Sequence, residues 1–161
     1  MKRINNPYAK LDGFNCFGCS PNNHLGLKME FFEEDEFVIS HWQPNHNLQG
    51  YLNILHGGIQ TALMDEIGSW IVQLKIKTAG VTSSLNTKFI NPVPTNKGQI
   101  KLKASIVKQR RNLVDVHVEL FKEEDVLCAQ SDITYFTYPL ELAKKKLYFP
   151  EQEEFYDKET N

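Results

Sequence analysis

The sequence predicts an α+β domain, in which one long helix covers a face of an antiparallel β-sheet. Three observations favour this class. Apolar residues recur at helical spacing over about residues 58–77. Later segments alternate apolar and polar residues, as half-buried strands do, and residues 114–120 are the clearest case. Turn signals rich in proline, asparagine and charged residues separate these segments, so that successive strands are expected to run antiparallel.

The composition is that of one globular domain. The chain has 161 residues, of which 41% are hydrophobic and 24% charged, enough to bury a substantial core. Its net charge of −2 provides no positive field toward nucleic acid or anionic membranes. No apolar run approaches the ~20 residues that span a bilayer, and no secretory signal follows the basic N-terminus. We therefore expect a cytoplasmic protein with no nucleic-acid or membrane partner.

Before the helix, the sequence predicts a leader and two short strands. Residues 1–24 are rich in proline and glycine and show little periodicity, so we expect a loop-rich leader. Strands are expected at residues 25–32 and 37–42, around an acidic turn at 33–36. A loop over residues 44–55 then leads into the helix.

After the helical region, which Gly80 ends, four strands are expected. They cover about residues 82–91, 99–109, 112–122 and 126–138. Residues 25–138 form the predicted domain, and residues 139–161 form a highly charged tail with a short helix and a frayed end.

The helix has distinct faces. Five apolar residues lie within about 80° of one another on a helical wheel and should meet the sheet. They are Ile59, Leu63, Ile67, Trp70 and Leu74. Asp65 lies on a different side, among mostly small residues that let a ligand or another backbone approach. Glu66 falls near the middle of the apolar stripe, where an unpaired charge is costly, so it needs a partner.

The start of the helix carries the strongest chemical signal. His56, Gly57 and Gly58 precede or open it, and free backbone N–H groups at this positive dipole end stabilise a negatively charged oxygen. Asp65 would supply a base or nucleophile. Gly57 and Asp65 are separated by roughly 12 Å along an α-helix that rises about 1.5 Å per residue. A site containing both must be shared between two chains, so we expect a homodimer or homotetramer.

His56-Gly57-Gly58, followed after six residues by Asp65, resembles the signature of the hotdog-fold acyl-CoA thioesterases. Residues 63–70 (LMDEIGSW) and 86–92 (NTKFINP) are similar to the phenylacetate-pathway, or PaaI-type, members. The resemblance covers about residues 14–138. It implies a hotdog fold, in which an antiparallel sheet wraps one long central helix and two protomers join their sheets.

The resemblance also implies roles for individual residues. The Gly57 amide, with Gly58 close by, would polarise the thioester carbonyl, and His56 would support the loop or the substrate. Asp65 would act as general base on water or as nucleophile, and Thr82 would orient the water. The reaction would convert an acyl-CoA to a free carboxylic acid and coenzyme A with no metal or cofactor.

Coenzyme A also brings phosphates, which require cations near the site. The residues expected to contact the substrate are Gly58, Glu66, Ser83, Lys88, Arg110 and Arg111. Structural roles stay open for some of them. Arg110 and Arg111 also suit a polar hairpin turn, and Glu66 also suits a purely structural pairing.

The three cysteines indicate a reduced environment. Cys16 and Cys19 have the C-x-x-C spacing of a metal site or redox pair. A zinc site needs four ligands, and no second such pair exists; a thioredoxin-type pair should open a helix, whereas this segment is predicted to be a loop. Structural thiols are therefore favoured for these two and for Cys128.

Two other functions on the same fold stay open. One is a non-catalytic acyl-CoA binding protein, which would bind ligand without releasing thiol. The other is a hydratase or dehydratase. Such hotdog enzymes pair an aspartate with a histidine about five residues later, and here that position is Trp70, which argues against this alternative. The acyl group itself leaves no signal in the sequence.

Overall fold

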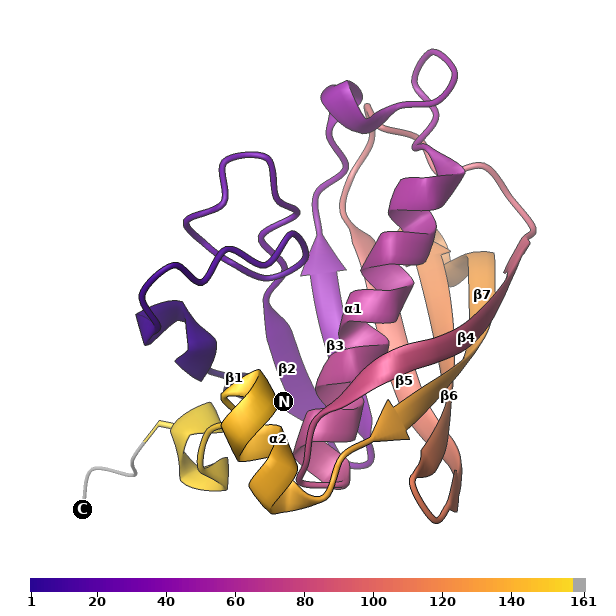
Figure 1. Cartoon of the computed structure of the whole chain (residues 1–161). Helices are drawn as coiled ribbons and strands as arrows, with labels where there is room; N and C mark the ends of the chain where they lie inside the picture. Colours follow the sequence, from indigo (N-terminus) through magenta and orange to yellow (C-terminus); the bar gives the residue numbers. More distant parts are fainter. Residues whose placement is uncertain (158–161) are drawn as a thin grey trace.

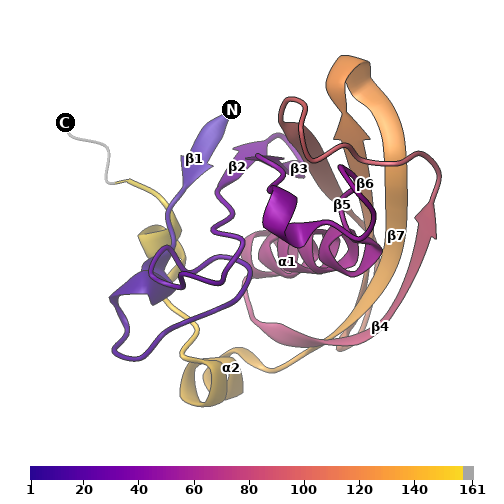
Figure 2. The same ribbon diagram turned by 90° about the horizontal axis from the view of Figure 1, so that it is seen from above.

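A seven-stranded antiparallel sheet curves around one long helix, α1 (Gly57–Lys75) (Figures 1 and 2). This computed structural model describes residues 1–157. The strands are β1 (Lys2–Ile4), β2 (Phe31–Glu34), β3 (Phe37–Trp42), β4 (Gly80–Phe89), β5 (Ile100–Arg110), β6 (Leu113–Lys122) and β7 (Val126–Thr137). Their order across the sheet is β1-β2-β3-β5-β6-β7-β4, which leaves β1 and β4 at the edges. The predicted α+β hotdog class is confirmed.

The remaining helices are short. They are α2 (Leu140–Leu147) and the 3₁₀ helices Pro7–Lys10, His46–Leu48, Glu123–Asp125 and Gln152–Phe155. Neither α-helix in the described part of the chain is both long and apolar enough to cross a membrane.

The predicted central helix and the four strands after it form within about two residues of their expected bounds. The strand predicted at residues 25–32 is wrong for residues 25–30, since β2 begins only at Phe31. The backbone there pairs with the leader: Leu27 N–H donates to the Phe17 carbonyl, and Met29 N–H to that of Gly18. Leu27 and Met29 are buried while Leu25 is exposed, and the segment belongs to no sheet.

The leader and tail contribute more to the fold than their composition indicates. The leader supplies β1, which extends the sheet beside β2. In the tail, Phe149 and Phe155 are buried, and the Phe155 and Trp70 rings pack edge to face. The tail therefore packs on the core up to this point, where a frayed end was expected. The end at residues 158–161 lies outside the described residues.

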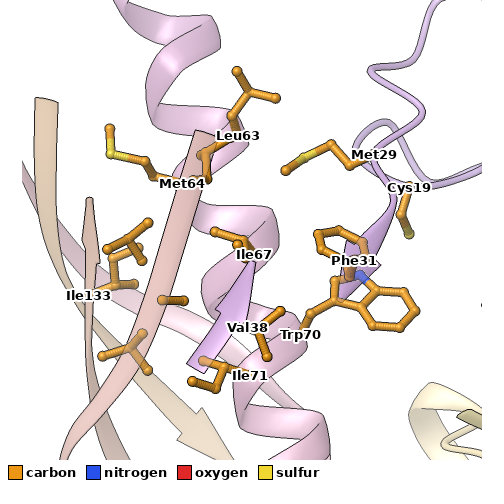
Figure 3. Close-up of a cluster of buried hydrophobic side chains, with 14 of the residues drawn as sticks. Cys19, Met29, Phe31, Val38, Leu63, Met64, Ile67, Trp70, Ile71 and Ile133 are labelled. Atoms are coloured by element: carbon orange, nitrogen blue, oxygen red, sulfur yellow. The ribbon is translucent and has the colours of Figure 1, made fainter. Parts of the chain in front are cut away.

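The core lies on both sides of α1. Leu63, Ile67 and Trp70 are buried as predicted, but Met64 and Ile71 are fully buried as well. Figure 3 shows Met64 and Ile133 to one side of α1, and Trp70 with Phe31 to the other. The buried stripe is wider than the helical wheel suggests because the curved sheet encloses the helix. Each such side chain contributes about 1.5–3 kcal/mol when it leaves water.

Candidate functional site

His56 caps the N-terminus of α1. Its ring Nδ1 accepts a hydrogen bond from the Gly58 N–H at 2.9 Å, so the hydrogen of the neutral ring lies on Nε2. Gly57 is the first residue of the helix, and its N–H cannot bond within the first turn. In the part of the chain that the structure describes, this N–H has no hydrogen-bond partner. Of the two predicted amide donors, Gly57 is therefore the available one.

A cavity of about 680 Å³ opens beside Gly57. Its apolar lining comes from the loop before α1 and from the end of β4: Tyr51, Ile54, Leu55, Phe89, Ile90 and Pro92. A Cβ built on Gly57 would lie 3.4 Å from the Phe89 ring, so this ring borders the amide directly. The cavity can hold an apolar group beside a hydrogen-bond donor at a helix N-terminus.

Asp65 lies two turns further along α1, held by two hydroxyl groups. Thr82 Oγ1 donates to Asp65 Oδ1 at 2.9 Å and lies 3.2 Å from Oδ2. Tyr135 Oη lies 2.9 Å from Oδ1 and 2.8 Å from the Asp65 carbonyl oxygen. Burial first, and then the charge of Asp65, raise the pKa of Tyr135, so this hydroxyl keeps its proton and donates.

Gly68 explains how Tyr135 reaches α1. A Cβ at this position would lie 2.4 Å from the Tyr135 hydroxyl oxygen, so any side chain would displace the ring. The small residue that the sequence places on the Asp65 face thus admits a side chain of β7. Tyr135 is the site residue that sequence reasoning missed. Its alternating position in a strand predicts burial, but nothing in the sequence links it to Asp65.

The structure brings the predicted catalytic residues into two groups. His56, Gly57 and Gly58 meet at the start of α1, and Asp65 meets Thr82. Asp65 does not line the cavity beside Gly57. Within one chain the two groups remain apart, as the helical rise requires.

The predicted substrate contacts are scattered. Ser83 occupies a bulge in the pairing of β4 with β7, and Lys88 is exposed on β4 next to Phe89. Arg110 forms an ion pair with Asp115 at 2.7 Å, and Arg111 lies in the following turn. These two arginines form the β5–β6 hairpin at the end of the sheet opposite the start of α1 (Figure 1).

Glu66 has the partners that its position on the apolar stripe requires. Trp70 Nε1 donates to its Oε1 at 3.1 Å, and Cys16 Sγ lies 3.6 Å from the same oxygen. The carboxylate therefore faces the leader and is not part of the lining of the cavity beside Gly57.

Comparisons with known proteins relate the chain to esterases and thioesterases. Residues 52–129 match the sequence model of the thioesterase superfamily. Over 97 residues (57% of the chain, 69% of the relative), the chain is 33% identical to a protein of Thermoplasma acidophilum named "putative esterase". It is 26% identical over 112 residues (70% of this chain, 80% of the relative) to a Haemophilus influenzae protein that is also named "putative esterase".

Solved structures share the fold. A thioesterase of Haemophilus influenzae superposes with a TM-score of 0.64 at 24% identity, over 71% of this chain and 80% of that one. A phenylacetic acid degradation-related protein from Ralstonia eutropha gives a TM-score of 0.61 at 21% identity, over 68% of this chain and 85% of that one. The chain belongs to the thioesterase superfamily. The proteins that it resembles are named esterases or thioesterases.

Proposed function

We propose that this protein is an acyl-CoA thioesterase of the PaaI type, which hydrolyses an acyl-CoA to a free carboxylic acid and coenzyme A. The observation that carries the proposal is the Asp65 carboxylate. Two hydroxyl groups from neighbouring strands orient it, and the scaffold is that of the thioesterase superfamily. An oriented carboxylate on such a scaffold suits the activation of water.

Gly57 would provide the electrophilic half of the site. Its free N–H, at the positive end of α1, donates to the thioester carbonyl oxygen as that oxygen becomes negative. A preorganised donor of this kind typically lowers the barrier by about 3–4 kcal/mol. The apolar cavity beside it accommodates the acyl group.

Asp65 would act through Oδ2. Within the carboxylate, the close contacts of both hydroxyl groups are to Oδ1, which leaves Oδ2 with only the longer contact to Thr82 and free to accept a proton or attack carbon. Thr82 has a single hydroxyl hydrogen, which it donates to Asp65. Its lone pairs remain to accept a hydrogen from the attacking water. Thr82 would thus position both the carboxylate and the water.

The two halves would meet across a subunit interface. Strand β4 ends the sheet, and nearly all of its residues are exposed. An unpaired edge strand offers its backbone to a second chain. A two-fold axis beside β4 would place Asp65 of one protomer near Gly57 of the other, in two equivalent sites.

The exposed Lys88 is one of the cations proposed to bind a phosphate of coenzyme A. It precedes Phe89, whose ring borders Gly57, but successive strand residues point to opposite faces, and Lys88 does not line the cavity. Arg110 is already paired with Asp115 at the opposite end of the sheet. Lys88 forms no ion pair among residues 1–157, so it remains available to a coenzyme A phosphate, whereas Arg110 is engaged.

A thiol-release assay across aromatic, short, medium and long acyl-CoAs tests the proposal. We expect release with at least one class and a 10²–10⁴-fold lower kcat in Asp65→Asn, because a positioned carboxylate contributes about this much. Asp132→Asn is the matched control, since this aspartate is exposed and pairs with His117.

Three outcomes are decisive. Full activity in a folded Asp65→Asn variant would remove the carboxylate from the mechanism. Ligand binding without thiol release from any acyl-CoA would favour the non-catalytic binding protein. Hydration of an unsaturated acyl-CoA would favour the hydratase, against which the sequence argues because Trp70 stands where such enzymes carry a histidine.

A further inference from the structure

Two cysteines of the leader and one carboxylate of α1 form a compact cluster. Cys16 Sγ lies 3.6 and 3.7 Å from the two carboxylate oxygens of Glu66. With Cys19 included, one ligand atom from each residue lies within 4.8 Å of the others. Cys19 is buried, while Cys16 and Glu66 are half-buried. The cluster thus joins segments that are about fifty residues apart in the sequence.

The turn that carries the cysteines lets the Glu66 carboxylate come close to its backbone. Ser20 N–H donates to the Cys16 carbonyl, which closes the turn. A Cβ at Gly18 would lie 2.3 Å from the Glu66 carboxylate, so a glycine is required at this point.

In the described part of the chain, no cation pairs with the carboxylate of the cluster, since no lysine, arginine or histidine there forms an ion pair with Glu66. Reactive redox thiols are found beside positive groups, whereas these two lie beside a carboxylate. A half-buried negative group flanked by two thiols is the environment that a bound cation stabilises.

We propose that Cys16, Cys19 and Glu66 bind one zinc ion. Two thiolates select zinc over magnesium or calcium, which prefer oxygen ligands. With Zn–S about 2.3 Å and Zn–O about 2.0–2.2 Å, a tetrahedral site has ligand–ligand edges of about 3.5–3.8 Å. The separations of Cys16 Sγ from the Glu66 oxygens already fall in this range.

The surroundings complete the site. The Trp70 N–H bond to Oε1 orients the Glu66 carboxylate, as outer hydrogen bonds do in zinc sites, and leaves Oε2 for the metal. A cavity of about 250 Å³ adjoins all three ligands and gives room for water as the fourth. Three protein ligands and an exchangeable position define an open site. Zinc would displace the two thiol protons and clamp the leader to α1 beside Asp65.

Metal titration of the full chain, reduced and stripped with chelator, tests the site without reference to activity. We expect one Zn²⁺ per chain with release of about two protons, and with Co²⁺ a thiolate-to-metal charge-transfer band. Affinity should fall at least about 100-fold in Cys16→Ser, Cys19→Ser and Glu66→Gln. Cys128→Ala is the matched control, because this buried thiol lies outside the cluster. Zinc should raise the unfolding temperature of the wild type and the control only.

The wild-type titration alone can overturn the proposal if a variant fails to fold. No uptake of either metal, or binding without the charge-transfer band, would contradict it. Equal affinity in Cys128→Ala and the cysteine variants would place the metal elsewhere, and unchanged affinity in Glu66→Gln would remove the carboxylate from the site. A reversible Cys16–Cys19 disulfide in a protein that binds no zinc when reduced would identify a redox pair instead.

Discussion

At the scale of single residues, Gly57 and Gly58 show how two identical neighbours acquire different roles. The His56 ring accepts the hydrogen of the Gly58 N–H, and this bond caps the helix. The Gly57 N–H points from the first position of α1 with no partner among residues 1–157. In the proposed mechanism one amide is structural and the other catalytic, a division that depends on the ring orientation of His56.

Gly57→Pro should lower kcat about 10²–10³-fold while leaving the fold intact, because it removes only the proposed donor. Proline suits the first helical position, where no hydrogen bond is lost. His56, with φ −59° and ψ 134°, already has the extended backbone that a following proline requires. The measurement is kcat for the best acyl-CoA, with circular dichroism as a check on folding.

Gly57→Ala is the control for this substitution. It keeps the N–H and adds a methyl group at ordinary contact distance from the Phe89 ring, so most activity should remain. Wild-type turnover in a folded Gly57→Pro variant would mean that another group polarises the carbonyl.

At the scale of elements, α1 turns consecutive residues toward different surroundings. Asp65 faces the hydroxyl groups of β4 and β7, whereas Glu66, about 100° further around the helix, faces the leader. Two adjacent carboxylates therefore serve separate proposed sites. The helix can do this because the sheet and the leader enclose it on several sides (Figure 2).

Glu33 connects three elements near the β1 edge of the sheet. Lys75, at the end of α1, forms an ion pair with this β2 carboxylate, and Tyr156 of the tail donates to Oε2 at 2.8 Å. Burial alone would raise the pKa of Glu33, but the hydrogen bonds from Lys75 and Tyr156 together outweigh it. The pKa of Glu33 is therefore below its usual value.

This lowered pKa predicts acid sensitivity. Stability from the ionised Glu33 is fully present above the unfolded-state pKa of about 4.3 and is lost as pH falls through the lower folded-state pKa. Glu33→Gln should thus be less stable than wild type at pH ~7, and the difference in free energy of unfolding should become smaller by pH ~3. Urea unfolding at both pH values measures it.

The neighbouring exposed Glu34 provides the comparison. Glu34→Gln removes a carboxylate from the same strand without touching the contacts to α1 and the tail. If the difference in free energy of unfolding between wild type and Glu33→Gln were the same at both pH values, the ionised Glu33 would not be the source of that stability.

At the scale of the whole molecule, the proposed reaction needs a second chain. Strand β4 exposes its edge and the apolar side chains of Leu85 and Phe89. Asp65 accepts a hydrogen bond from Thr82, near the start of this strand, and Gly57 lies beside the ring of Phe89, at the end of the strand. A two-fold partner along β4 would therefore cover both halves at once.

Mixing two inactive variants tests this arrangement directly. Asp65→Asn retains a working Gly57 amide, and Gly57→Pro retains a working Asp65. After dissociation and reassociation, random pairing of the chains should restore about a quarter of the sites, all in mixed dimers. The measurement is kcat per chain before and after mixing, with sedimentation to confirm the dimer.

The control mixes each variant with itself by the same procedure and should recover nothing. If the mixed sample also stayed inactive although the subunits exchange, the site would be confined to one chain. Full wild-type activity in a monomer would lead to the same conclusion.

Local sequence patterns determine much of this protein without reference to any tertiary contact. The helical period marked α1, strict alternation marked β5 and β6, and His56-Gly57-Gly58 with Asp65 marked the proposed site and its family. Such features follow from the backbone geometry of residues a few positions apart. For that reason a single sequence displays them.

Only the tertiary structure decided which distant groups meet. It placed Tyr135 on Asp65, paired the backbone near Leu27 with the leader instead of the sheet, and packed Phe155 onto Trp70. It also brought Cys16 to Glu66, the third ligand that the C-x-x-C spacing lacks. These contacts join residues that are ten to seventy or more positions apart. They depend on how the sheet curves and where each loop closes, which no local period encodes.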